Sequence, residues 1–152
     1  METLGFEDPV EITKSEIARV QLVEAIELFL AGKYLPGITL AGAAEEILAR
    51  LLNQKGEGSI VERSIELILQ LREQTGLPVM GVKPKKEIFK EWNTARNQLK
   101  HHSKPREEVV TINLFDEAYW MIRRALSNAS KLGLHIENEQ EFENWVITNI
   151  NM

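Results

Sequence analysis

The chain has 152 residues, of which 43% are hydrophobic and 27% are charged, and its formal net charge is −5. This length and balance suit one globular domain with a sizeable core, and they exclude a disordered chain. The absence of cysteine excludes disulfide bonds and thiolate metal sites. Because the N-terminus lacks a signal-peptide pattern and no uncharged run reaches the ~18 residues of a membrane span, we expect a cytoplasmic protein without a membrane segment.

The first half of the chain predicts a loose arm followed by two helices. Pro9 blocks regular structure, so residues 1–12 are expected to form a flexible N-terminal arm. Thr13 and Glu16 match a capping box that opens a helix ending near Gly32. The next helix begins around Pro36, runs to residue 55 and stops at the glycines that follow. Its small side chains predict that it is the central helix, approached closely by others; they are Gly37, Ala41, Gly42, Ala43, Ala44 and Ala49.

The second half predicts three or four more helices. Ser59 and Glu62 form a second capping box before a third helix, which a loop over residues 75–83 follows. A fourth helix is expected over residues 84–102, ending because Pro105 disfavours helix just before it. A fifth spans residues 113–132 and a short sixth spans 138–150. The fold class predicted is therefore all-α, a single up-and-down bundle of about five to six helices over residues 13–152.

The charge is distributed unevenly along the chain. Residues 83–106 contain eight basic and two acidic side chains, a net charge of +6, which leaves −11 for the remainder. The overall acidity argues against broad coating of nucleic acid, but the local excess permits one anion-binding patch. The lysines expected to hold a phosphate backbone are Lys86, Lys90, Lys100 and Lys104.

The predicted fourth helix places its chemically active residues on different sides. At 100° per residue, Arg96 falls at the edge of an apolar stripe. Asn97 and His101 fall on the far side, one turn apart, so that Asn97 can orient the His101 ring. His102 falls near the core side, where a structural role is expected. Since Arg96 and His101 diverge within one helix, one copy cannot easily direct both at one atom. Two copies meeting across a twofold axis could supply both groups to a shared cleft, and unwinding near residues 103–105 would help.

Arginine and histidine together suit cleavage of RNA without a metal ion or cofactor. An arginine fork stabilises charge on phosphate oxygens, and a histidine can move the proton of a 2′-hydroxyl. Motifs for other chemistries are missing from the sequence, including the P-loop, the dinucleotide-binding glycine loop, the zinc-binding H-E-x-x-H and the hydrolase serine elbow. No metal site is predicted.

Two adjacent carboxylates, Glu45 and Glu46, lie within an apolar helix. They cannot both face the core, because neighbouring residues point 100° apart. The favoured interpretation is one ion-paired residue, with a base such as Arg19 or Arg50, beside one solvated residue. A catalytic role for either carboxylate is the alternative.

Residues 96–101, RNQLKH, resemble the signature of the HEPN superfamily, in which an arginine, often followed by asparagine or another polar residue, is separated from a histidine by four to six intervening residues. Residues 29–46 also look like those of uncharacterised bacterial HEPN-like proteins, and the resemblance covers about residues 13–132. It implies an all-α, commonly dimeric protein with Arg96, Asn97 and His101 as catalytic residues. His102 also satisfies the spacing. Some toxin members carry a tyrosine two residues past the histidine, where this chain has Ser103.

The resemblance implies two functions. The first is a metal-independent RNA endonuclease, acting as a homodimer in a toxin–antitoxin or defence system and paired with an antitoxin protein. The second is a non-catalytic HEPN-like module that binds RNA or a protein partner. Cleavage by the first function would persist in EDTA, whereas the second predicts only salt-sensitive binding.

Overall fold

The described residues of a computed structural model, 2–79, 81 and 83–150, form seven α-helices and a short 3-10 helix, without a β-strand. The all-α class is thereby confirmed. The structure has one helix more than the expected five to six, because the predicted fourth helix divides at Asn93. Met1, in the predicted arm, and residues 151–152, in the predicted domain, lie outside the described residues. The helices are α1 (Lys14–Leu30), α2 (Tyr34–Gln54), α3 (Ile60–Thr75), α4 (Lys85–Trp92), α5 (Thr94–Lys100), α6 (Leu114–Lys131) and α7 (Glu139–Asn149), with the 3-10 helix at Pro105–Glu107.

The capping box predicted at Ser59 is complete, whereas the one predicted at Thr13 is only half formed. The Thr13 hydroxyl accepts from the Glu16 amide at 3.1 Å, although the Glu16 carboxylate bonds to Arg19 and not back to the cap. Ser59 and Glu62 form the complete reciprocal box, with distances of 3.0 and 3.2 Å. These bonds satisfy amide groups that would otherwise lack partners in the first turn.

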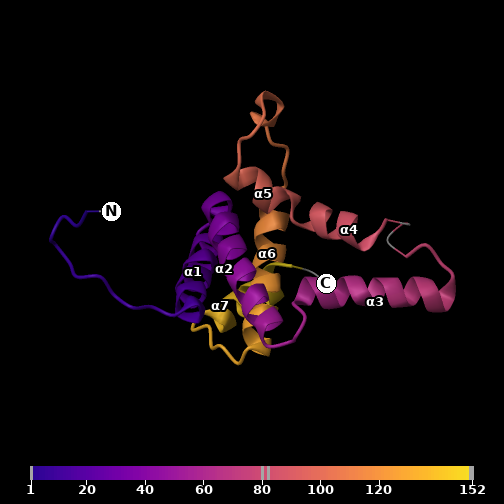
Figure 1. Ribbon diagram of the computed structural model, residues 1–152, viewed down its shortest axis with the longest axis horizontal. Helices are drawn as coiled ribbons and strands as arrows, with labels where there is room; N and C mark the ends of the chain where they lie inside the picture. Colours follow the sequence, from indigo (N-terminus) through magenta and orange to yellow (C-terminus); the bar gives the residue numbers. More distant parts are fainter. Residues whose placement is uncertain (1, 80, 82, 151–152) are drawn as a thin grey trace.

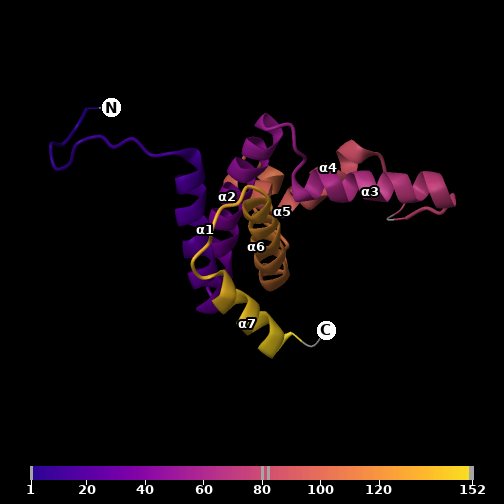
Figure 2. The ribbon, with the colours of Figure 1, turned by 90° about the horizontal axis from the view of Figure 1, so that it is seen from below.

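The main bundle is built around α2, which lies between α1 and α6 (Figures 1 and 2). Its small residues Ala41, Gly42 and Ala44 are buried, so the neighbouring helices approach closely, as the sequence predicted. Their large core partners include Leu22, Ile26, Ile38, Leu48 and Ile122. No described helix combines the length and apolar character that crossing a membrane requires.

An aromatic cluster attaches α7 to this bundle. Phe29 on α1 packs edge-on against Phe142 and Trp145 of α7, with ring centroids 5.3 and 4.9 Å apart. Tyr34 and Phe115 complete the cluster. Such contacts add to the burial of area, so α7 is held by packing more than by its own helix propensity.

The helices α3 and α4 project sideways from the bundle (Figures 1 and 2). We call this part the α3–α4 projection. It has a small core of its own, in which Val61 and Ile65 meet Ile88. Its base is tied to α6 by a hydrogen bond of 2.8 Å from the Ile60 amide to the Asn128 side chain.

Candidate functional site

The break between α4 and α5 creates the site. The break is caused by side chains that form hydrogen bonds to backbone carbonyls, which in a continuous helix would accept from backbone amides. The Asn93 side-chain amide donates to the Phe89 carbonyl, and the Thr94 hydroxyl donates to the Lys90 carbonyl, both at 2.9 Å. Arg124, from α6, donates to the Trp92 carbonyl at 3.0 Å. Because such bonds compete with the helix ladder, the chain turns at Asn93 and lays α5 across α2.

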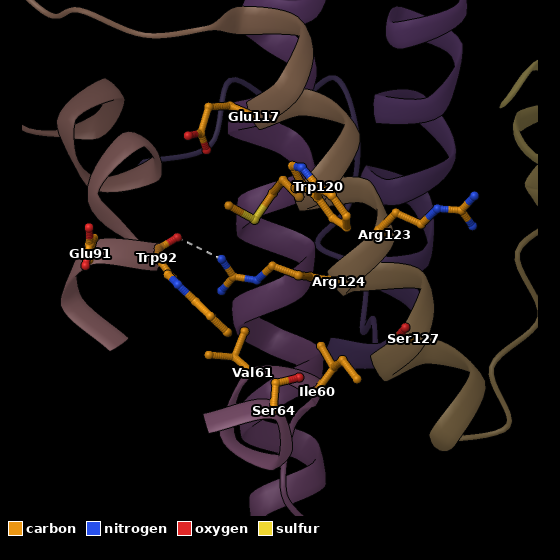
Figure 3. Close-up of a pocket in the computed structure, with 11 residues that line it drawn as sticks. Ile60, Val61, Ser64, Glu91, Trp92, Glu117, Trp120, Arg123, Arg124 and Ser127 are labelled. Carbon is orange, nitrogen blue, oxygen red and sulfur yellow. Dashed lines mark hydrogen bonds between the residues drawn. The ribbon is translucent and has the colours of Figure 1, made fainter. Parts of the chain in front are cut away.

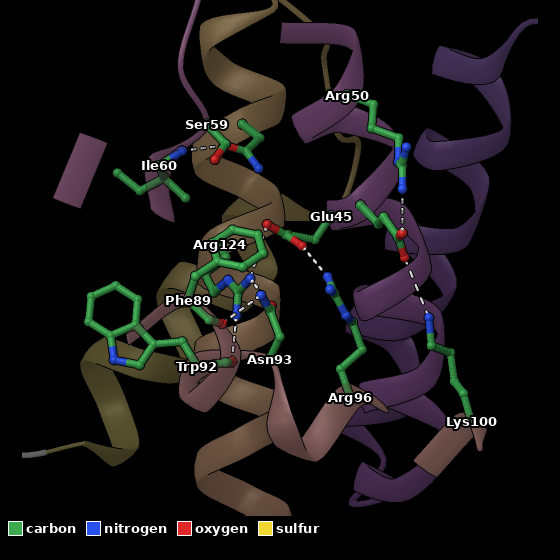
Figure 4. Close-up of polar contacts among 12 residues, drawn as sticks. Glu45, Arg50, Ser59, Ile60, Phe89, Trp92, Asn93, Arg96, Lys100 and Arg124 are labelled. Atoms are coloured by element: carbon green, nitrogen blue, oxygen red, sulfur yellow. Dashed lines mark hydrogen bonds and ion pairs between the residues drawn. The ribbon is translucent and has the colours of Figure 1, made fainter. Parts of the chain in front are cut away.

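Beneath this turn lies a buried cluster of charged groups, which we call the Glu45 cluster; it consists of Glu45, Arg96 and Arg124 (Figure 4). Glu45 is 3% exposed, and its two carboxylate oxygens contact different arginines. Arg96 Nη1 lies 2.7 Å from Oε2, and Arg124 Nη2 lies 3.2 Å from Oε1. The second bond of Arg124 Nη2 goes to Asn93 Oδ1 at 2.7 Å. The cluster therefore joins α2, α5 and α6.

The charges within the cluster do not balance. Two guanidinium groups share one carboxylate, and neither the Nε of Arg96 nor that of Arg124 has a hydrogen-bond partner among the described residues. Burial lowers the pKa of Arg124, and the positive charge of Arg96 lowers it further, while Glu45 opposes both effects. Arginine nevertheless stays protonated near neutrality. The carboxylate of Glu45 is thus the charge that keeps both arginines inside.

Gly42 provides the space for Arg96. A Cβ atom added at Gly42 would lie 2.8 Å from both Cγ and Cδ of Arg96. Any larger residue at this position would displace the arginine stem from α2. The requirement for glycine here is steric and not conformational, because Gly42 lies within a regular helix.

The structure separates the residues that the sequence grouped. Arg96 is 8% exposed and engaged by Glu45, whereas Asn97 and His101 are both exposed. Among the described residues, no hydrogen bond or ion pair joins Arg96 to either of them. His101 caps the C-terminus of α5 in an extended conformation. The expectation that His102 faces the core is wrong, because α5 ends at Lys100 and His102 is exposed in the following loop.

Glu45 and Glu46 differ in burial, as expected, but both are ion-paired, so the expectation that one of them is only solvated is wrong. Glu46 is partly exposed and bonds to Arg50 at 3.2 Å and Lys100 at 3.4 Å. These cations lower the pKa of Glu46 against the opposing effect of burial. The predicted pairing with Arg50 is confirmed for Glu46. The partners of Glu45 were not anticipated, and Arg19 instead pairs with Glu16 and Glu137.

The predicted phosphate-binding lysines are all exposed, and at least one of them is ion-paired. Lys86 and Lys90 on α4 have no carboxylate partner among the described residues, while Lys100 is shared with Glu46. Lys104 lies exposed in the loop after α5. This loop also carries His101 and His102, and it extends away from the bundle (Figure 1). The ammonium groups of Lys86 and Lys90 are accessible to a ligand, in contrast to the guanidinium of Arg96.

A groove lies beside the Glu45 cluster, between the α3–α4 projection and α6 (Figure 3). We call it the Trp groove, and its volume is about 750 Å³. Trp92, Trp120 and Met121 form apolar walls, and Arg124 and Glu117 contribute polar groups. Burial raises the pKa of Glu117, although the neighbouring Arg124 opposes this. Trp120 is 62% exposed.

Sequence reasoning missed Arg124, Glu117 and Trp120, which all lie on α6. The signal available was weak: Arg124 falls in the middle of a strongly amphipathic helix, next to Arg123 and among buried alanines. Arg123 differs from its neighbour in that it pairs with Glu143 on α7. Only the fold reveals which of two adjacent arginines points inward.

The chemistry available is that of charge and apolar contact. Among the described residues, no three histidine, aspartate or glutamate side chains come together in a way that could hold a metal ion. In comparisons with protein-family models, curated proteins and solved structures, none matched this chain.

Proposed function

We propose that this protein is a HEPN-like helical module that binds RNA without cleaving it. The observation that supports this is the position of Arg96, whose guanidinium is buried against Glu45 and so removed from any phosphate in solvent. A catalytic arginine must meet the charge that develops on a phosphoryl group. Withdrawing Arg96 from Glu45 would leave that carboxylate with Arg124 alone.

RNA binding is assigned to the exposed cations around α4 and the loop after α5. Lys86 and Lys90 have their ammonium groups available, and Lys100 and Lys104 extend this surface beyond α5. Because the remainder of the chain is acidic, the contact is local. Four lysines on single-stranded RNA predict a salt dependence of log K on log salt of roughly −3.

Binding of labelled single-stranded RNA, followed over a range of salt concentrations, tests this proposal. Replacing Lys86 and Lys90 by Ala should weaken binding and reduce the slope by about 1.4. Lys33 and Lys55 lie at the ends of α2, outside the basic segment, so their double replacement is the matched control for lost charge. Equal losses in the two double variants would contradict an RNA surface at α4.

Metal-independent RNA cleavage is the second candidate, and the exposure of His101 favours it. An exposed imidazole one turn from Asn97 and next to Lys100 is available to a substrate. It requires an arginine from elsewhere or a rearranged Arg96. The family resemblance adds a homodimer and an antitoxin partner as further proposals.

Incubation with labelled RNA and EDTA distinguishes the two candidates. The binding module predicts no cleavage above a blank preparation. Cleavage that persists in EDTA but disappears in His101→Ala, with His102→Ala as the neighbouring control, would overturn the proposal in favour of the nuclease. His101→Ala is a cleaner probe than Arg96→Ala, since Arg96 also contributes to the buried cluster.

A further inference from the structure

Phe89 on α4 is placed differently from the other phenylalanines within helices. Its side chain is 43% exposed, and it belongs to neither apolar core. The others take part in the aromatic cluster that attaches α7; they are Phe29, Phe115 and Phe142. Ile88, the neighbour of Phe89, fills the small core that α4 shares with α3. Because a single exposed apolar residue is normal on a protein surface, the surroundings of Phe89 must show whether it has a role.

The charged residues of α4 are sorted around the helix with respect to Phe89. At 100° per residue, Lys86 lies about 60° and Lys90 about 100° from Phe89. Glu87 and Glu91 both lie about 160° from it, on the opposite side of the helix. The exposed surface of α4 is therefore divided into an acidic side and a basic side, and Phe89 lies on the basic side.

The cations next to Phe89 are available to a ligand. Lys86 and Lys90 are exposed and have no carboxylate partner among the described residues. Lys85 lies one turn before Phe89, and its ammonium group is 3.8 Å from a carboxylate oxygen of Glu66. An aromatic ring between unpaired ammonium groups is a combination that binds single-stranded nucleic acid, because the cations attract phosphates and a base can stack on the ring.

The two other exposed aromatic side chains have surroundings that do not suit phosphate. Trp120 is 62% exposed, but Glu117 lies one turn before it on α6 and Glu91 lines the same groove. The two arginines that line this groove already have carboxylate partners on other helices. Phe6 lies in the N-terminal arm, where residues 2–12 include four carboxylates and no lysine or arginine. Of the exposed aromatic rings, Phe89 is thus the one with unpaired cations beside it.

We propose that an unpaired base of RNA stacks on Phe89, while Lys86 and Lys90 bind the phosphates on either side of that base. The proposal rests on the RNA-binding function above and adds the class of RNA. A base within a duplex is stacked between its neighbours, so the ring can accept only a base from a single strand or an open loop. Charge alone would favour the duplex, which carries more phosphates per unit length. A preference for single strands would therefore come from Phe89.

Titration of a labelled single-stranded RNA tests the ring directly. Phe89→Leu keeps an apolar side chain but removes the flat ring, and it should weaken binding at least about fivefold. Phe89→Tyr retains the ring and should bind as wild type does. Trp120→Leu is the matched control for an exposed aromatic elsewhere, and it should leave the affinity unchanged. Circular dichroism checks that each variant is folded. Wild-type affinity in Phe89→Leu would overturn the proposal.

The salt dependence separates the ring from the lysines. Phe89→Leu removes no charge, so its affinity should fall by the same factor at every salt concentration and the slope should stay that of wild type. Replacing Lys86 and Lys90 by Ala should instead reduce the slope by about 1.4. A smaller slope in Phe89→Leu would contradict a direct contact between base and ring, because the substitution would then act through the lysines.

A change on the RNA side completes the test. An abasic RNA of equal length keeps the phosphates and lacks the bases, so wild type should bind it at least about fivefold more weakly than intact RNA. Phe89→Leu should bind the two RNAs about equally, because it has no ring to lose. Wild type that binds intact and abasic RNA alike would overturn the stacking proposal and leave RNA binding by the lysines standing. Wild type that binds neither RNA would overturn the proposed function and this inference together.

A duplex of the same sequence provides the last comparison. Wild type should bind the single strand more tightly than the duplex, and Phe89→Leu should lose this preference. A preference for the single strand that is equally strong in Phe89→Leu would assign the selection to another part of the molecule and would contradict the role of Phe89.

Discussion

Arg96 and His101 lie five residues apart, yet they belong to two regions with opposite properties. Arg96 is part of the Glu45 cluster, in which side chains from three helices form largely buried ion pairs. His101 begins the exposed loop after α5. The comparison teaches that a motif defined by spacing does not report the environment of its residues. A buried arginine stabilises helix packing, whereas an exposed histidine is available for a ligand.

The largest expected effect in this comparison follows from removing the shared carboxylate. Glu45→Ala leaves Arg96 and Arg124 buried without a counter-charge, and breaking a buried pair in this way should lower the free energy of unfolding by about 3–5 kcal/mol. Thermal and urea denaturation measure this change. Glu46→Ala is the adjacent control; because its ion pairs are partly exposed, its cost should stay within about 1 kcal/mol. Equal losses of unfolding free energy in the two variants would mean that the buried ion pairs of Glu45 stabilise the fold no more than the exposed ones of Glu46.

The next effect tests the steric basis of the buried position. Gly42→Ala should raise helix propensity, but its Cβ would lie 2.8 Å from Arg96 Cγ and Cδ, so we expect a net loss of about 1–2 kcal/mol. Gly37→Ala on the same helix is the matched control. Its nearest neighbour would be the Ala25 carbonyl at 3.5 Å, an ordinary contact, and its stability should stay equal or rise by up to about 1 kcal/mol.

A neutral or stabilising result for Gly42→Ala would itself be informative. It would mean that Arg96 can leave its position beneath α5 at little cost. An arginine of that mobility could reach solvent phosphate, and the nuclease alternative would gain support. Assaying the same variant for RNA cleavage in EDTA would then decide between the two candidates.

Local interactions made part of this fold predictable from the sequence. The cap at Thr13 and the capping box at Ser59 depend on residues within three positions, and the thin surface of α2 is visible as small residues at helical spacing. These features were read correctly because the physical cause and its effect lie within one element.

The site itself depends on contacts between distant parts of the chain. Arg96 meets Glu45 across 51 positions, and the break at Asn93 is held by Arg124, which is 31 positions away. Helix periodicity places Arg96 at the edge of an apolar stripe, but it does not show whether a neighbouring helix provides a carboxylate for the guanidinium. The predicted continuous helix over residues 84–102 was wrong partly for the same reason. Asn93 and Thr94 bond locally to two helix carbonyls, but the bond to the Trp92 carbonyl comes from Arg124 on α6.

A smaller effect concerns the carboxyl of Glu117, at the boundary between the buried cluster and the open groove. Burial raises its pKa in the folded chain, so the ionised form destabilises the fold at neutral pH, although Arg124 offsets part of this. Glu117→Gln should therefore stabilise the protein near neutrality, by less than about 1 kcal/mol because the group is partly exposed. The gain should shrink as pH falls through the raised pKa and vanish below the ordinary value, where both states are protonated. Denaturation at several pH values measures it, and a gain that grew in acid would contradict the assignment.

The smallest expected effect sharpens the comparison from its exposed side. His101→Ala should leave the free energy of unfolding within about 0.5 kcal/mol of wild type, because the ring is exposed and has no hydrogen bond or ion pair among the described residues. Arg96→Ala, measured beside it, should be clearly destabilising because Glu45 loses its 2.7 Å partner. A large loss for His101→Ala would show that the loop after α5 is packed against something, such as a second copy. The proposed RNA-binding module rests on the distinction between a buried, structural Arg96 and an accessible His101. Such packing would remove that distinction.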